Sequence, residues 1–362
     1  MRFQITVRLL AILLSIVPSV ACGAQFVTVN ASVRDLGYSP LSGLVYGSIP
    51  NSAPTNPNTL LPMDPFSGGQ ETAIPIGFDP NKVAVSYDGA NVWAIVGGSR
   101  AVQRYHVPTQ TNDQFFTING GPQFNAIYSI PDRPDAVLMH SFNPGISPPG
   151  GVNAVYENAV RLPTAWGGPD IVSVDPTDGT RAFGYVNSNT SFGSSLGQIG
   201  PTGIQGVGGS QLSGVLTGFG IGRVQLVGDR LFTNQGAIYS VSLGIQVGAF
   251  QGAGNFVIDP STDRFFSITT NGPTQTIHAY SLDTLASIGT DTVTGVPGGT
   301  FALTRFGEDG LAFATANEVV FVRSVLVPEP TSLALALCGA LGLAAATVVR
   351  RRKGAVVNVP RS

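Results

Sequence analysis

The chain has 362 residues, of which only 11% are charged, and it contains 46 glycines and 26 prolines. This composition, with Val, Ile, Phe and Tyr in between, is typical of many short strands joined by tight turns. Residues 25–326 carry 12 basic and 20 acidic side chains, a net charge of −8 against −2 for the whole chain. Because affinity for nucleic acid comes from Lys and Arg, this balance argues against a nucleic-acid partner.

Residues 1–24 form a predicted signal peptide. Two arginines precede an apolar run, and small residues at Cys22 and Ala24 suit cleavage by signal peptidase after Ala24. Alternatively, Cys22 is the acylated residue of a lipoprotein, although Ser19 stands where a bulky aliphatic residue is expected. The other cysteine, Cys338, lies in the second apolar end segment, so the region between has no disulfide and no cysteine nucleophile.

A turn followed by a strand of large residues recurs seven times along residues 25–326. The markers of these turns are Gly43, Gly89, Asp135, Gly179, Asp229, Asp263 and Asp309, which lie 46, 46, 44, 50, 34 and 46 residues apart. Asp accepts backbone N–H groups in tight turns, and Gly adopts positive φ without steric cost. A period in the mid-forties that contains only strands predicts the four-stranded blades of a β-propeller.

The two ends of the repeat predict how the ring closes. The seventh unit has room for only three strands before the C-terminal segment, whereas a spare strand, 26–33, precedes the first unit. Pairing that strand onto the seventh unit would protect both sheet edges. We therefore expect an all-β fold, a seven-bladed β-propeller over residues 25–326 closed by the N-terminal strand.

Two segments depart from the period. Residues 143–151 are rich in Pro and Gly and are interpreted as a long loop on one face. Residues 188–222 are rich in Gly and Ser, and we expect two irregular strands of the fourth unit there. The fifth unit is correspondingly short.

Three segments resemble the YVTN-like family of bacterial β-propellers, which includes lactonase-type and quinoprotein-type proteins. These segments are 35–40 (DLGYSP), 81–89 (NKVAVSYDG) and 303–313 (LTRFGEDGLAF). The resemblance covers roughly residues 30 to 325 and implies a seven-bladed ring. Because the matching motifs belong to the scaffold, the resemblance does not imply a reaction.

The C-terminal region predicts a membrane segment with a sorting motif. Val327, Pro328, Glu329 and Pro330 precede about nineteen apolar or small residues, which can span a bilayer. A basic cluster then follows, made of Arg350, Arg351, Arg352 and Lys353. This order resembles a PEP-CTERM sorting signal over 327–353, which implies cleavage by an exosortase. The basic cluster predicts a cytoplasmic tail at 354–362, with the propeller outside. The alternative is an ordinary C-terminal transmembrane anchor.

No catalytic or metal-binding set is evident in the sequence. The three histidines, His106, His140 and His278, have no ligand-pair spacing, and turn formation explains the repeated aspartates better than Ca²⁺ binding does. Ser194 and Ser195 lack a G-x-S-x-G motif, and the glycine runs lack the lysine of a phosphate loop. We therefore predict no catalytic residue, no cofactor and no metal.

The tryptophans and the axial funnel are the remaining binding candidates. Trp93 lies within a predicted strand and is interpreted as core, whereas Trp166, in PTAWGGP, is placed in a loop and is the candidate for stacking on a sugar. The funnel at one face of the ring is the default ligand site of a propeller, but the sequence does not identify the charged residues that line it.

Three functional hypotheses follow. The first is an exported, membrane-anchored or exosortase-processed propeller that binds a surface protein or a glycan without catalysis. The second is a periplasmic or extracellular enzyme of lactonase or quinoprotein-dehydrogenase type, which requires a metal or quinone on the ring axis. The third is a purely structural component of an extracellular matrix.

Overall fold

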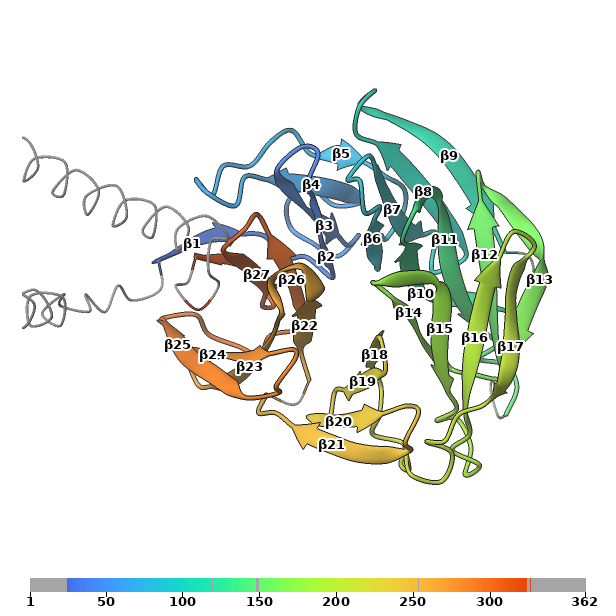
Figure 1. The fold of residues 1–362 in the computed structure, drawn as a ribbon. Coiled ribbons are helices and arrows are strands. Elements are labelled where there is room, and N and C mark those ends of the chain that lie inside the picture. The colour runs from blue at the N-terminus through green and yellow to red at the C-terminus, as the bar shows by residue number, and fades with distance from the viewer. Residues whose placement is uncertain (1–24, 119, 148–149, 253, 324–325, 327–362) are drawn as a thin grey trace, which may run out of the picture.

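A computed structural model describes residues 25–118, 120–147, 150–252, 254–323 and 326. The fold is all-β and propeller-like: four-stranded units surround a central axis, with the first strand of each unit innermost (Figure 1). The helical content of the described residues is a single 3-10 turn, η1 (Pro260–Thr262). No helix among them has the length and apolar character needed to cross a membrane. The predicted signal peptide and sorting segment lie outside the described residues.

The first two units follow one pattern, in which the strands pair antiparallel in chain order. Unit 1 consists of β2 (Leu36–Ser39), β3 (Leu44–Ile49), β4 (Thr59–Met63) and β5 (Ile74–Pro75). Unit 2 consists of β6 (Val83–Val85), β7 (Asn91–Val96), β8 (Ala101–His106) and β9 (Thr111–Thr117).

The next two units are joined into one eight-stranded sheet through a single parallel bridge between Thr164 and Gly203. Unit 3 consists of β10 (Gln123–Ile130), β11 (Arg133–Phe142), β12 (Gly151–Glu157) and β13 (Val160–Gly167). Unit 4 consists of β14 (Ile171–Asp175), β15 (Asp178–Tyr185), β16 (Ser194–Gly200) and β17 (Gly203–Gly209). The two strands expected within 188–222 are therefore present as β16 and β17.

The last three units complete the arrangement. Unit 5 consists of β18 (Val224–Val227), β19 (Arg230–Thr233), β20 (Ala237–Ser240) and β21 (Ile245–Ala249). Unit 6 consists of β22 (Phe256–Asp259), β23 (Arg264–Asn271), β24 (Thr274–Ser281) and β25 (Ser287–Thr294). Unit 7 consists of β26 (Ala302–Phe306), β27 (Gly310–Ala314), β28 (Glu318–Arg323) and the N-terminal strand β1 (Gln25–Asn30).

Strand β1 supplies the fourth strand of unit 7, as its sequence position predicts. It pairs antiparallel with β28 along its whole length, from Gln25 opposite Arg323 to Asn30 opposite Glu318. Strands from the two ends of the described chain are thus joined by backbone hydrogen bonds, which leaves β28 with no free edge.

The hydrophobic core consists of wedges between neighbouring sheets. Trp93 of unit 2 packs with Phe124 of unit 3, and Phe232 of unit 5 packs with Phe265 of unit 6. The cluster around Phe306 and Met63 joins unit 7 to unit 1, so the packing also continues across the point of closure. Each Å² of apolar surface removed from water stabilises the fold by about 25 cal/mol, so these wedges make the main stabilising contribution.

The turn markers are confirmed with two exceptions, Gly179, which lies inside β15 just after the turn at 176–177, and Asp135. The turn between β10 and β11 contains Asp132, whose φ of 60° places it in the left-handed region, whereas Asp135 lies inside β11. Its carboxylate binds Arg104 of unit 2 at 2.6 Å, so Asp135 links two units. The Pro- and Gly-rich insertion falls between β11 and β12.

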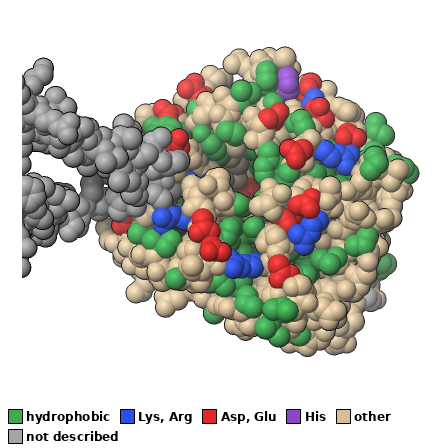
Figure 2. Space-filling view, in the orientation of Figure 1, with side chains coloured by type: hydrophobic (Ala, Val, Ile, Leu, Met, Phe, Trp, Pro, Cys, Tyr) green, Lys and Arg blue, Asp and Glu red, His purple; other side chains and the backbone are tan. Residues whose placement is uncertain are grey.

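Acidic and basic side chains lie interspersed over the face shown in Figure 2.

Candidate functional site

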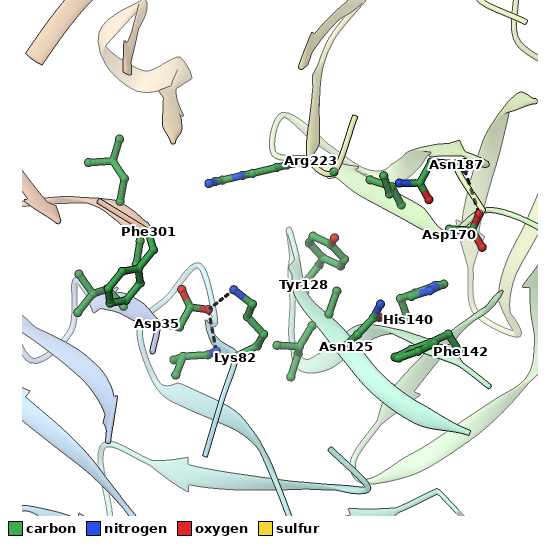
Figure 3. A pocket seen from close by; sticks show the side chains of 18 of the residues that line it. Asp35, Lys82, Asn125, Tyr128, His140, Phe142, Asp170, Asn187, Arg223 and Phe301 are labelled. Atoms are coloured by element: carbon green, nitrogen blue, oxygen red, sulfur yellow. Dashed lines mark hydrogen bonds and ion pairs between the residues drawn. The ribbon is translucent and has the colours of Figure 1, made fainter. Parts of the chain in front are cut away.

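A cavity of about 560 Å³ opens at one mouth of the ring axis. Units 1, 2, 3, 4 and 7 and the segment that leads into unit 5 all contribute to its wall. Figure 3 shows Arg223 and Tyr128 extending toward its middle, with Asp35 and Lys82 on one side and His140 and Asp170 on the other. Its lining includes Asp35, Lys82, Asn125, Tyr128, His140, Phe142, Asp170, Asn187, Arg223 and Phe301.

The repeat itself positions much of this wall. Five lining residues immediately precede the innermost strand of their unit, so the ring places them at one level around the axis; they are Asp35, Lys82, Asp170, Arg223 and Phe301. Unit 3 contributes differently, because a β-bulge between Phe124 and Ala126 leaves Asn125 unpaired and directs it into the cavity. Bulges commonly re-aim a side chain in this way.

Arg223 extends into the middle of the cavity (Figure 3). Its guanidinium carbon lies 5.0 Å from the ring centre of Phe256, a cation–π contact that supports the side chain from one side. Among the described residues, the guanidinium makes no hydrogen bond or ion pair, although Asp35 attracts it electrostatically. Burial lowers the pKa of Arg223 below its usual value, but an arginine keeps its charge near neutral pH.

Tyr128 points its hydroxyl toward the same central space (Figure 3). Burial raises the pKa of this phenol to about 12, so the hydroxyl stays protonated and can donate a hydrogen bond. Within the described part of the chain, the hydroxyl has no hydrogen-bond partner. Arg223 and Tyr128 together therefore present unused donors to the cavity.

Asp35 and Lys82 form the neighbouring part of the wall. The Lys82 Nζ atom lies 3.9 Å from Asp35 Oδ2, which also accepts a hydrogen bond from the backbone N–H of Val83 at 3.1 Å. At 3.9 Å the contact is a loose ion pair, so the ammonium of Lys82 can also serve a second anion.

His140 forms the opposite wall, and its tautomer follows from its neighbours. The Asn153 side-chain nitrogen donates to the carbonyl oxygens of Trp166 and Pro169, so Asn153 Oδ1 faces His140 Nδ1 at 2.9 Å. The Nδ1 atom must then carry the proton and donate to Asn153. His140 Nε2 is left as an acceptor with no partner among the described residues, on a side chain that is 1% exposed. Burial lowers the pKa of His140, which favours this neutral form.

Asp170 lies beside His140 with its carboxylate held in place by backbone (Figure 3). Its Oδ2 atom accepts hydrogen bonds from the N–H groups of Asn187 and Ser188, at 3.0 and 2.9 Å. The Asn187 side chain donates to the carbonyl of Ile221 at 3.0 Å, which ties the segment before unit 5 to the same wall. This side of the cavity is therefore rich in acceptors, whereas the side of Arg223 and Tyr128 offers donors.

The predicted loop position of Trp166 is wrong. Trp166 lies in β13 and is 6% exposed. Its indole packs on Gly184, Gly197 and Gly206 of unit 4, where an added Cβ would lie only 2.5 to 2.8 Å from the ring. These glycines leave a slot between two sheets that the indole fills, so Trp166 is a core residue with no face available for a sugar.

The other sequence candidates lie apart from one another. Trp93 is 1% exposed, as predicted for a core residue. His106 contacts Thr109, and His278 contacts Thr269 through Nε2 at 2.9 Å, both in outer strands. The described residues contain no group of three or more His, Cys, Asp or Glu side chains arranged to hold a metal ion. The sorting residues 327–330 and 350–353 lie outside the described part.

Comparison with known proteins supports the fold alone. No protein-family model matches the chain, and no curated protein matches it. A chain of Kuenenia stuttgartiensis hydrazine synthase superimposes with a TM-score of 0.60 at 12% identity, covering 82% of this chain and 97% of that one. A chain of the mitotic checkpoint complex gives a TM-score of 0.57 at 14% identity, covering 82% and 91%. Both are propeller-type folds, so the chain belongs to the class of all-β, propeller-like proteins.

Proposed function

We propose that the chain is an exported seven-bladed β-propeller that binds a ligand in its axial cavity and catalyses no reaction. The observation that carries the proposal is the pair of cavity groups without protein partners in the described structure: the Arg223 guanidinium and the Tyr128 hydroxyl. Recessed polar groups cost free energy when they remain unpaired, so a site that retains them is suited to a ligand that pairs them. The surroundings are concave and partly apolar, with Phe142 and Phe301 beside the polar groups.

The proposed location rests on the two end segments. A signal peptide would export the chain, and the 327–353 segment would hold it in the inner membrane until an exosortase cleaves near Pro328 and Glu329. The last strand, β28, ends at Arg323, so cleavage there would release the complete ring. The mature protein would then act at the cell surface or in the extracellular matrix, with a surface protein or a glycan as its partner.

Fractionation of the native host with and without its exosortase tests the location. A tag on the C-terminus should stay in the membrane fraction while the propeller is shed. If the tag accompanies the shed propeller, the chain is not cleaved and the sorting proposal is wrong.

Pull-down of glycans and surface proteins with the shed protein tests binding. The variant Gly222→Trp should lose the captured partner, because Gly222 lines the cavity and its surroundings are open enough for an indole to fill the mouth. The matched variant Gly200→Trp, in β16 and outside the cavity lining, should retain it. Equal capture by both variants would show that the partner binds at a site away from the axial cavity.

A second measurement separates binding from catalysis. Metal analysis and absorbance spectroscopy of the purified protein should detect no stoichiometric metal or quinone. A stoichiometric metal or quinone, lost in Gly222→Trp, would replace this proposal with a lactonase-type or quinoprotein-type enzyme.

A further inference from the structure

We infer that the axial cavity takes a hydroxylated monocarboxylate, a uronic acid, with its carboxylate held by Arg223 and Tyr128. This inference rests on the proposed function, because it names the ligand of the same cavity. The planar guanidinium of arginine matches the two oxygens of a carboxylate, and the phenol adds a third donor. Lys82 contributes positive charge beside them, since its contact with Asp35 is loose.

The charges of the wall favour a single negative charge on the ligand. Arg223 and Lys82 face Asp35 and Asp170 around the same space. A phosphate dianion would meet both carboxylates in a confined cavity, and like charges at short range are strongly unfavourable there. A carboxylate places its one charge against Arg223 and leaves the remainder of the ligand neutral.

The wall opposite Arg223 selects hydroxyl groups. Asn125 offers both a donor and an acceptor from its bulge. Sugar hydroxyls donate and accept, so they can satisfy both ends of this amide. Asp170 already accepts two backbone N–H bonds on one oxygen, which leaves its second oxygen for a hydroxyl rather than demanding a cation.

The size and apolar parts of the cavity agree with a sugar ring. A volume of about 560 Å³ lies within the usual range for small-molecule sites of about 300–1,000 Å³. Phe301 is 40% exposed at the rim and can contact the C–H face of a ring. The mouth is open, so the acid can be a free monosaccharide or the last residue of a polysaccharide chain.

Calorimetric titration of the full chain in detergent with galacturonate, its linear tetramer and galactose tests the inference. Galacturonate or the tetramer should bind at least about tenfold more tightly than galactose, because galactose leaves the charged donors unpaired. Stronger binding of the tetramer would identify a polysaccharide end as the source, and stronger binding of galacturonate would identify the free acid.

Two variants connect the affinity to the proposed anchors. Arg223→Met should lower the affinity for galacturonate by about 10- to 100-fold, the usual effect of losing a charged hydrogen-bond partner. Tyr128→Phe should weaken it by about 2- to 10-fold without affecting folding, since the hydroxyl bonds no described residue. The control Arg230→Met, whose guanidinium donates to the carbonyl of Asp283 outside this cavity, should leave the affinity unchanged.

The outcomes separate the two proposals. Equal affinity for galactose and galacturonate, with both lost in Gly222→Trp, would overturn the carboxylate and keep the axial binding site. Galacturonate binding that Arg223→Met and Tyr128→Phe leave intact would also overturn the inference. No binding of any of the three probes would reject the uronic acid, while the pull-down with Gly222→Trp would still decide the proposed function.

Discussion

His140 Nδ1 lies 2.9 Å from Asn153 Oδ1, and this hydrogen bond determines which ring nitrogen of His140 carries the proton in the wall of the axial cavity. The two donors of Asn153 are taken by the carbonyls of Trp166 and Pro169, so His140 has no choice of tautomer. A buried contact between two strands of unit 3 thereby holds one side chain of the cavity wall in place.

This contact predicts a pH dependence of stability. Burial lowers the pKa of His140 in the folded protein, so the unfolded chain takes up a proton first as the pH falls below about 6.5. The free energy of unfolding should therefore decrease on acidification, with a slope of up to about 1.4 kcal/mol per pH unit for one proton.

Urea unfolding of the wild type and His140→Gln between pH 8 and pH 5 measures the effect. The variant should show a shallower decrease, and the slope that remains should include His278, whose pKa burial also lowers. Parallel curves for the two proteins would contradict the assignment.

Trp166 and Gly197 predict a steric effect at the interface of units 3 and 4. A Cβ on Gly197 would lie 2.5 Å from the indole, so Gly197→Ala should destabilise the protein by about 1–3 kcal/mol through overpacking. Gly200→Ala in the same strand has open space around it and should change stability by less than about 0.5 kcal/mol. Equal effects in thermal unfolding would mean that the indole does not occupy this slot.

The register of β1 predicts that an aspartate substitution destabilises the fold strongly at one position and very little at the adjacent one. Val29 is 3% exposed and pairs with Val319, whereas Thr28 is exposed. Val29→Asp would bury a charge and should cost more than about 3 kcal/mol, while Thr28→Asp should stay within about 0.5 kcal/mol. Chemical denaturation measures both, and a larger loss for Thr28→Asp would show that the strand pairs with the opposite face inward.

Arg104 predicts how strongly units 2 and 3 are linked. Its guanidinium bonds Asp113 and Asp135, each at 2.6 Å, and the side chain is 7% exposed. Arg104→Met should therefore destabilise the fold by about 2 kcal/mol. The control Arg34→Met removes a more exposed pair with Asp79 and should cost less than about 1 kcal/mol.

The ion pair between Arg104 and Asp113 predicts a second dependence of stability on pH. The hydrogen bond from Arg104 lowers the pKa of Asp113, so its stabilising contribution is present above the ordinary aspartate value and is lost as the pH falls through the lowered one. The stability difference between wild type and Arg104→Met should thus shrink below about pH 4. A difference that stays constant down to pH 2 would exclude the ion pair as its cause.

Much of the fold could be predicted from the sequence because turn residues act locally. Gly89 and Asp263 mark turns through their own backbone preferences, and the missing strand of unit 7 matched the spare strand at the start of the chain. Asp135 was misassigned because its partner, Arg104, belongs to another unit and leaves no local signal.

The site was less accessible to sequence analysis. The residues before the innermost strands share a position but no chemistry, as Lys82, Asp170 and Phe301 illustrate, so no motif marks them. Once the strands are placed, that shared position would have identified them. Trp166 was misplaced because PTAWGGP resembles a turn, while the glycines that enclose its indole come from another sheet.

A crystal structure of the purified protein with galacturonate tests the central claim most directly. The account predicts the carboxylate within about 3 Å of the Arg223 guanidinium and the Tyr128 hydroxyl, with a sugar hydroxyl at hydrogen-bond distance from the Asn125 side chain. A sugar bound at another surface, or one in the cavity with its carboxylate turned away from Arg223, would contradict it.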